Sequence, residues 1–310
     1  MSTAEVSGVE PHTGGATTPD SAPTLRMTRM LDLEQLEVEL FRGFGVERSP
    51  MRVFGGVVAA QSLVAAGRTV PAGRLVHSLH AYFLRPGDPS VPIVYRVDPI
   101  RDGGSFTTRR VTAQQHGEAI FTLSASFHTP EDGFTHQLPR LDAPSPEDLP
   151  VTPGSMDDAD ELSRRWYSTL PERHPFEFRF DGELPRLATG RGERVAPRQR
   201  FWLRSREPLP DDPLLHRCAA TYASDMLLLS SSLGLHGTTL DSRDLQFASL
   251  DHAVWFHGPF RADEWLYYDQ EGTWAGGGRA LCRGRMFNRA GALVVSVVQE
   301  GLIRQRPRVE

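Results

Sequence analysis

The feature of this sequence that most limits its possible folds is an internal repeat. Two stretches of the chain carry a glycine pair and then a single glycine at identical spacing, Gly103-Gly104 with Gly117 and Gly277-Gly278 with Gly291. The same alignment pairs Arg109 with Arg283, and a recurring His-Ala sequence upstream pairs His80 with His252. Matching turns at matching distances indicate a duplicated structural unit. The sequence therefore predicts two copies of one module.

Each copy combines a helix with a run of strands. Residues 57–66 are small and apolar on every side, which is typical of a buried helix, and strand-like runs follow at 75–84, 91–100, 106–115 and 119–128. The second copy has a strand at 201–204, a long helical stretch at 211–233, and strands at 247–256, 264–270, 278–288 and 292–304. A further short helix is predicted at 31–41.

The predicted fold class is α+β. A helix that is apolar on all faces is buried on every side only where a sheet curls around it. We therefore expect two antiparallel sheets, each wrapped around a long buried helix. Pairing the two sheets through their edge strands would remove exposed edges and give one continuous sheet.

Composition divides the chain further. Residues 1–24 are rich in Ser, Thr, Gly and Pro and lack the order of a signal peptide, so they are predicted to be a disordered tail. The first module is assigned to 25–130, the second to 196–306, and a short C-terminal tail to 307–310. Residues 131–195 are dense in Pro, Asp and Glu and are predicted to be a linker with a helix at 157–167.

Charge and residue usage exclude several function classes. The net charge is −5, which argues against a general nucleic-acid binder. All basic residues are Arg, so a lysine Schiff base and a P-loop are both excluded. The two cysteines, Cys218 and Cys282, are too few for a disulfide framework or a zinc cluster and suit a reducing cytoplasm. No apolar run is long enough for a membrane span, and no metal or cofactor is predicted.

Three polar residues of the second copy stand in apolar surroundings. Asp225 precedes four apolar residues, Ser249 lies in a predicted strand, and Gln299 ends the run 294–298. A buried carboxylate without a partner is costly, so a group of such residues indicates a site. Taken singly, each is more often structural, because buried polar groups frequently serve only the fold.

Several segments together resemble a known family. They are Val53-Phe54-Gly55-Gly56, the stretch 75–88 that ends in Leu-Arg-Pro-Gly-Asp, Ala223-Ser224-Asp225, the stretch 250–257, and Val298-Gln299-Glu300-Gly301. With their spacing, they are similar to acyl-CoA thioesterase II, the bacterial TesB-like family with a double-hotdog fold. The resemblance runs from about residue 30 to residue 304.

This resemblance implies an Asp, Thr, Gln triad that orients a water for attack on a thioester. Carried over, the triad is Asp225, Ser249 and Gln299, with Ser249 standing where the family has Thr. Ser keeps the hydroxyl, so water positioning should survive, although a nucleophilic Ser249 stays open. The expected reaction releases a free fatty acid, of medium to long chain, and CoA.

Further site residues are weaker predictions. Backbone N–H groups at the start of the first buried helix could hold the oxyanion, and these are Gly55, Gly56 and Val57. The acyl chain could contact Phe54, Met226, Leu227, Trp255 and Phe256, while the CoA phosphates could meet Arg109, Arg110, Arg283, Arg285 and Arg304.

Two alternative functions keep the same fold. A hotdog hydratase or dehydratase would need a His with a nearby carboxylate, and His77 and His80 are the candidates. A non-catalytic acyl-CoA-binding protein is the other alternative, since the Ser249 departure could mark a damaged site. For any of these functions, acyl-CoA is the expected partner, without nucleic acid, in a homo-oligomer of two or four chains.

Overall fold

A computed structural model describes residues 25–45, 52–138, 142–151, 156 and 159–306. The predicted tails, 1–24 and 307–310, lie outside the described residues. The first half of the chain forms α1 (Met27–Met30), β1 (Glu34–Glu37), β2 (Leu40–Gly43), α2 (Gly55–Gly67), β3 (Leu75–Phe83), β4 (Ile93–Asp102), β5 (Phe106–Gln115) and β6 (Glu118–His128). The predicted buried helix and the four strands after it are therefore confirmed.

The remaining elements complete the second module and the segment before it. Residues 131–195 contain η1 (Pro146–Asp148), α3 (Glu161–Arg173), β7 (Phe176–Phe180) and α4 (Pro185–Gly190). Then follow β8 (Arg198–Ser205), α5 (Pro213–Ser224), η2 (Leu229–Ser232), η3 (Gly234–His236), β9 (Leu245–Ser249), β10 (Asp251–Phe256), β11 (Leu266–Gly276), β12 (Arg279–Asn288) and β13 (Leu293–Gln305). Strand β7 pairs with β8, so the segment before the second module contributes to its sheet.

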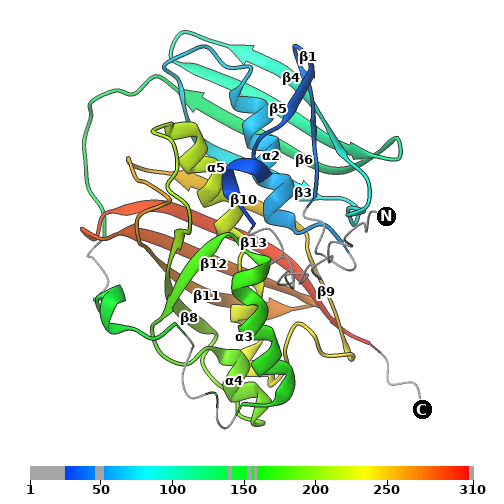
Figure 1. Ribbon diagram of the computed structural model, residues 1–310, viewed down its shortest axis with the longest axis vertical. Helices are drawn as coiled ribbons and strands as arrows, with labels where there is room; N and C mark the ends of the chain where they lie inside the picture. Colours follow the sequence, from blue (N-terminus) through cyan, green and yellow to red (C-terminus); the bar gives the residue numbers. More distant parts are fainter. Residues whose placement is uncertain (1–24, 46–51, 139–141, 152–155, 157–158, 307–310) are drawn as a thin grey trace, which may run out of the picture.

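The described strands join into one 13-stranded sheet with a palindromic order. The order is β1-β2-β4-β5-β6-β3-β10-β13-β12-β11-β8-β7, with β9 added beside β13. Reading outward from the centre, β3, β6, β5 and β4 correspond to β10, β13, β12 and β11. Figure 1 shows the two modules meeting along β3 and β10, whose antiparallel pairing is centred on His80 and Ala253. The continuous sheet and the double-hotdog fold are thus confirmed.

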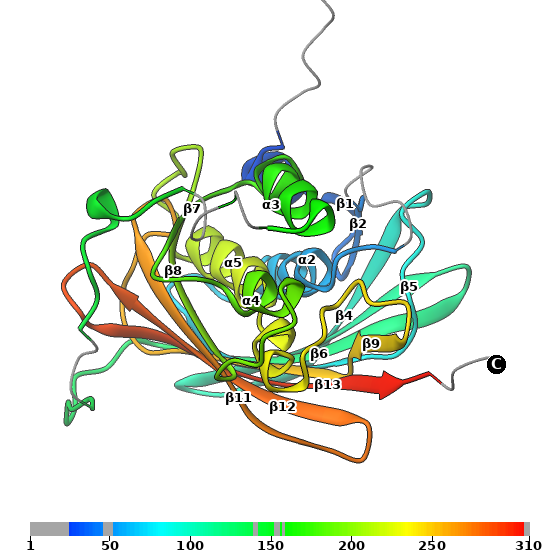
Figure 2. The same cartoon turned by 90° about the horizontal axis from the view of Figure 1, so that it is seen from below.

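The two central helices lie side by side against one face of this sheet (Figure 2). Helix α2 consists almost entirely of Ala, Val and other small residues, and positions 56–66 are all buried. Helices α2 and α5 run antiparallel, because the start of α2 touches the end of α5: a Cβ on Gly56 would lie 2.5 Å from the carbonyl oxygen of Tyr222. None of the described helices is long and apolar enough to cross a membrane.

Two helix predictions were wrong. Residues 31–41 form the hairpin of β1 and β2 instead of a helix, because β2 completes the edge of β4 and buries Phe41. The stretch 211–233 is not one long helix. Helix α5 ends at Ser224, and Leu227 takes a left-handed φ of 63°, which an α-helix does not accommodate.

The repeat is correct in topology but wrong in its residue pairs. Arg109 is buried on the helix side of β5, whereas Arg283 is exposed on the opposite face of β12. Likewise His80 is exposed while His252 is buried against α5. Neighbouring residues of a strand point to opposite faces, so a shift of one residue reverses the side. The matching glycine turns therefore did not determine which strand residues of the two copies correspond to each other.

Candidate active site

Asp225 lies where α5 stops. It is the residue directly after the helix, with φ −82° and ψ −10°, and Met226 N–H still donates to the Ala223 carbonyl. The chain turns away at Leu227. This turn leaves the Asp225 carboxylate at the junction of the two modules, close to the start of α2.

Gln299 connects Asp225 to Ser249. Strand β13 carries Gln299 on its buried face, and β9 pairs with β13 so that Ser249 lies opposite Gly301. The Gln299 side-chain amide donates to Asp225 Oδ1 at 3.0 Å and to Ser249 Oγ at 2.6 Å. The structure therefore brings together the three residues that the sequence singled out, from a helix end and two neighbouring strands.

Three further side chains hold the turn that carries Asp225. Tyr268 Oη donates to the Ser224 carbonyl at 2.6 Å, and the Gln270 amide donates to the Met226 carbonyl at 2.7 Å. The Gln199 amide donates to the Leu227 carbonyl at 2.6 Å. All three side chains come from the strands beneath, so the carbonyls around Asp225 are satisfied by the sheet. These three residues were not predicted from the sequence, although Tyr268 and Gln270 stand at alternate positions of a strand-like run and were a signal.

The start of α2 approaches Asp225 very closely. A Cβ on Gly55 would lie 2.7 Å from Asp225 Oδ2 and 2.7 Å from the Phe83 ring, so a side chain at this position would displace its neighbours. The Val57 N–H is already used, because it donates to the Phe54 carbonyl at 3.1 Å. Of the three backbone candidates for an oxyanion site, Gly55 and Gly56 are the ones nearest to Asp225.

The electrostatics of the site favour a proton acceptor that works near neutral pH. Burial raises the pKa of Asp225 to about 6 from an ordinary value of 3.8. The Gln299 amide, the Gly56 N–H, the Arg52 charge and the Ser249 hydroxyl act in the opposite direction and keep the rise moderate. A carboxylate with such a pKa is ionised at pH 7 and is a better base than an exposed Asp.

His252 supports the end of α5 from below. Its Nε2 lies 2.7 Å from Ser224 Oγ, and that hydroxyl donates its own hydrogen to the Thr221 carbonyl at 2.8 Å. The imidazole Nε2 is therefore the donor. Burial lowers the pKa of His252 to about 4, although the Gln299 amide opposes this. His252 is thus a neutral, fully buried support for the helix end.

The predicted acyl-chain residues lie in different places. Phe54 packs edge-on against Tyr222 and His174, with ring centroids 5.0 and 5.3 Å away, directly before α2. Met226 and Phe256 are buried in the core. Trp255 is on the opposite face of the sheet from the helices, where it packs against His80. It is not brought together with Asp225.

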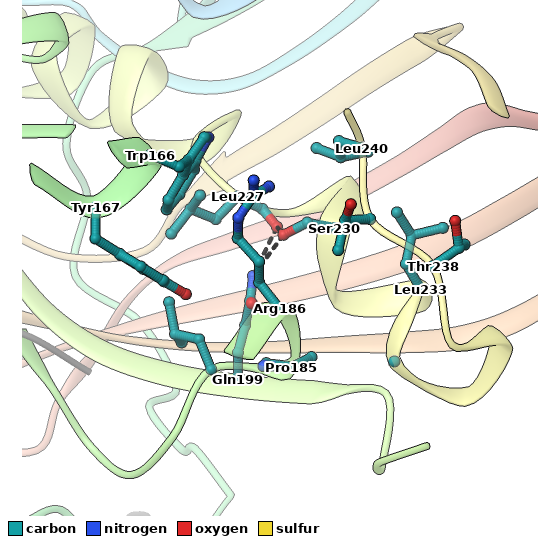
Figure 3. A pocket seen from close by; sticks show the side chains of 13 residues that line it. Trp166, Tyr167, Pro185, Arg186, Gln199, Leu227, Ser230, Leu233, Thr238 and Leu240 are labelled. Carbon is teal, nitrogen blue, oxygen red and sulfur yellow. Dashed lines mark hydrogen bonds between the residues drawn. The ribbon is translucent and has the colours of Figure 1, made fainter. Parts of the chain in front are cut away.

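Leu227 lines a small pocket beneath α3 and α4. Figure 3 shows Leu227 there with Trp166 and Leu240, while Gln199 bonds to the Leu227 carbonyl and to Ser230. The pocket has a volume of about 30 Å³, room for a few water molecules and far below the roughly 300 Å³ of small-molecule sites. As it stands, it has no room for an acyl chain.

The predicted phosphate-binding arginines are scattered. Arg109 is buried in the first module, where it pairs with Asp102 at 2.9 Å and bonds to Thr69. Arg110 pairs with Asp98 at 2.6 Å, and Arg285 with Asp269 at 2.7 Å.

Arg283 and Arg304 are exposed on β12 and β13. Arg52, which the sequence analysis did not select, is the cation whose charge influences Asp225. Its guanidinium stacks 4.8 Å above the Phe247 ring, on the strand that carries Ser249.

The two histidines considered for hydratase chemistry lie away from the helices. His77 contacts Ser126 at 2.8 Å on the outer face of the sheet, and His80 packs against Trp255 on the same face. Neither is placed to act beside a buried helix, so the arrangement gives no support to a hydratase. Among the described residues, no group of His, Cys, Asp or Glu is arranged to hold a metal ion.

Comparisons with known proteins identify the family of the chain. Residues 170–302 match the family model described as acyl-CoA thioesterase, and residues 47–128 match the acyl-CoA thioesterase N-terminal domain. The chain is 40% identical over 294 residues to acyl-coenzyme A thioesterase 8 of Mus musculus, covering 91% of this chain and 90% of that protein. It is 34% identical over 285 residues to acyl-CoA thioesterase 2 of Haemophilus influenzae, covering 90% of this chain and 96% of that protein.

A solved structure has the same fold. The acyl-CoA thioesterase II TesB2 from Mycobacterium marinum is 45% identical and superimposes with a TM-score of 0.74. The superposition covers 91% of this chain and 100% of that structure. By sequence and by fold, this chain belongs to the TesB-like acyl-CoA thioesterase II family and is a thioester hydrolase.

Proposed function

We propose that this protein hydrolyses fatty acyl-CoA to a free fatty acid and CoA, and that Asp225, Ser249 and Gln299 do so with a directly attacking water. One observation carries the proposal: a single buried amide, that of Gln299, bonds both the Asp225 carboxylate and the Ser249 hydroxyl. The Gln299 amide holds the Asp225 carboxylate and the Ser249 hydroxyl beside each other. A water nucleophile needs such a pair: a carboxylate to accept its proton and a hydroxyl to orient it.

In this mechanism Asp225 is the general base. The water donates one hydrogen to the ionised carboxylate while its oxygen attacks the thioester carbonyl carbon. Ser249 accepts a hydrogen from Gln299, so its own hydroxyl hydrogen is free to orient the water or Asp225. Collapse of the tetrahedral intermediate breaks the C–S bond. The proton held by Asp225 then goes to the departing CoA sulfur, and the carboxylic acid is the second product.

The developing oxyanion needs donors in a pocket that excludes water. The backbone N–H of Gly55 is the first candidate, because it opens α2 and a helix N-terminus favours negative charge, whereas the Gly56 N–H already bonds the Asp225 carboxylate. The first module then supplies the oxyanion donors and the second supplies the base. In this proposal the two modules are 25–130 and 196–306, joined by 131–195, whose strand β7 adds to the second module's sheet.

The substrate contacts are a finer proposal. We favour Phe54 and Leu227 as contacts of the acyl chain: Phe54 directly precedes Gly55, which approaches Asp225, and Leu227 lies two residues after Asp225. The substrates are proposed to have medium to long acyl chains. A pocket of about 30 Å³ beside Leu227 must open before a long chain can enter it. Arg52 replaces the more distant arginines as the first candidate for a CoA phosphate, because it lies on the side of Ser249.

Ser249 as a nucleophile is the alternative mechanism. A serine nucleophile usually takes a histidine as its base, and among the described residues the Ser249 hydroxyl bonds the Gln299 amide and the Asp225 carboxylate but no histidine. The water mechanism therefore has better support. We also propose that the protein forms a homo-oligomer of two or four chains. We further propose a cytoplasmic location, because the two buried free cysteines suit a reducing compartment.

The test measures thiol release from acetyl-, decanoyl- and palmitoyl-CoA. Asp225→Asn and Gln299→Ala are each expected to lower kcat by about 100-fold or more, the size of a general-base or positioning contribution. Ser249→Thr should stay active. Full activity of Asp225→Asn would refute the mechanism, and a labelled acyl group trapped on Ser249 would establish covalent catalysis instead.

A further inference from the structure

A second and larger pocket lies at the opposite end of the paired helices. It is found at the start of α5 and has a volume of about 340 Å³, within the range of small-molecule sites. Its apolar walls come from both modules and are formed by Leu75, Pro213, Pro259, Phe260, Trp265 and Leu266. The triad residues lie elsewhere, at the end of α5, so this pocket is separate from the candidate active site.

His216 presents an unused donor to this pocket. The side chain lines the pocket, and the residue is only 3% exposed. Its Nδ1 accepts the Ala262 N–H at 3.1 Å, so the ring hydrogen of the neutral imidazole is on Nε2. That Nε2 is buried and has no hydrogen-bond partner among the described residues. A buried donor without an acceptor costs free energy, and a ligand in the pocket that His216 lines would supply the acceptor once the ring turns to expose Nε2.

Arg217 adds an uncompensated positive charge to the same pocket. Its Nε is buried without a partner, and within the described parts of the chain its guanidinium makes no ion pair. The neighbouring Arg261 differs, because it pairs with Asp211 and Asp263. A partly buried cation that lacks a counter-ion is destabilising, which makes a purely structural role for Arg217 a poor explanation.

The pocket also occupies the place that the palindromic fold relates to the candidate active site. Helix α2 starts beside Asp225, and helix α5 starts at this pocket. The first turn of α5 is capped by Asp212, whose carboxylate accepts the Leu214 N–H at 2.9 Å. The two helix starts therefore differ: the start of α2 faces the proposed base, and the start of α5 faces a pocket with unpaired donors.

We propose that this second pocket binds a small organic monocarboxylate with an apolar tail. The carboxylate would accept from His216 Nε2 and pair with the Arg217 guanidinium, which matches a planar carboxylate. The apolar walls would cover the tail. Glu264 and Asp211 also line the pocket, and their negative charges favour a singly charged ligand over a phosphate.

The product of the reaction proposed above is such an acid, so the enzyme's own product is a candidate ligand. That choice of ligand rests on the proposed function, whereas the proposal of a carboxylate site does not. Octanoate represents a fatty-acid product, and benzoate represents a carboxylate that the enzyme does not release. Binding of octanoate alone would assign the pocket to product. Binding of both would assign it to small carboxylates in general.

The experiment titrates the full-length protein with octanoate by calorimetry. Wild type is expected to bind octanoate saturably, and Arg217→Met to bind it at least tenfold more weakly, with thioesterase kcat unchanged. Octanol, of equal length but neutral, should not bind. Asp225→Asn separates this pocket from the active site, because it should keep octanoate binding at wild-type affinity.

Two further readouts keep the outcome decisive. Arg217→Met should leave the melting temperature equal or raise it in the absence of ligand, since it removes an unpaired buried charge. Leu75→Trp, which fills the pocket without touching the charge, should also abolish binding. The proposal is overturned if wild type shows no saturable binding, if Arg217→Met and Leu75→Trp both bind as wild type does, or if Asp225→Asn alone changes the affinity.

Discussion

Gly55 and Asp225 meet at the junction of the two modules, where a Cβ on Gly55 would lie 2.7 Å from Asp225 Oδ2. Gly55 opens the central helix of the first module, and Asp225 follows the central helix of the second. The contact therefore places the positive end of one helix at the proposed base of the other module. The three candidate residues belong to the second module, and the first module brings the start of its helix against one of them.

This contact predicts the effect of a single methyl group. Gly55→Ala would push against Asp225 and against the Phe83 ring, so kcat is expected to fall about 10- to 100-fold through misplacement of the base. Thiol release from decanoyl-CoA measures it. Gly104→Ala is the matched control, because its methyl meets no atom within 4 Å. Equal activity of both variants would show that the close approach does not matter for catalysis.

The pKa of Asp225 predicts the pH dependence of the reaction. Burial raises it to about 6, and the base works only when it is unprotonated. The kcat/KM of wild type should therefore rise as the pH increases from 5 to 7 and level off above. Initial rates over pH 4.5 to 8 provide the profile. A flat profile between pH 5 and 7 would be inconsistent with Asp225 as the base.

The same raised pKa predicts a cost in stability. Between pH 4 and 6 the folded protein holds a proton on Asp225 that the unfolded chain has released, so this group's contribution to stability falls as the pH rises through that window. Asp225→Asn avoids burying the charge. At pH 7.5 it should melt a few degrees higher than wild type, and the difference should shrink towards pH 4. A lower melting temperature at pH 7.5 would contradict this.

Tyr268 is predicted to position Asp225 through the backbone. Tyr268→Phe removes the bond to the Ser224 carbonyl and leaves that buried oxygen unsatisfied, at a cost of about 1–3 kcal/mol. Because Asp225 is the next residue, kcat should fall about tenfold with little change in KM. Tyr95→Phe is the control, since Tyr95 bonds Gln61 inside the first module. If both variants lose stability and kcat equally, Tyr268 has only a structural role.

The fold could be predicted largely from local patterns. The strand at 119–128 follows from the alternation of its buried and exposed residues. The buried helix at 57–66 follows from its run of small apolar residues without a polar face. The helix prediction at 31–41 failed because β2 is stabilised by its pairing with β4. That pairing joins residues far apart in the chain, and no local pattern contains it.

The candidate site was predicted in part. Asp225, Ser249 and Gln299 were visible as polar residues in apolar runs that match a family. Arg52 and Tyr268 were missed, because their roles depend on what lies across from them in space. Arg109 was selected for its charge, yet it is buried and paired with Asp102, which depends on the face of β5 that it occupies.

The sequence by itself determined the number of modules, the buried helix and the strands that follow it, and it singled out Asp225, Ser249 and Gln299 as candidates. These follow from spacing, periodicity and residue type, which are properties of the chain alone. Only the tertiary structure shows that β3 pairs with β6, and it alone decided the face of each strand and the closeness of Gly55 to Asp225. It also decided the separate pocket with unpaired His216 and Arg217. The physical reason is that burial, pKa and hydrogen-bond satisfaction arise between residues that the sequence holds far apart.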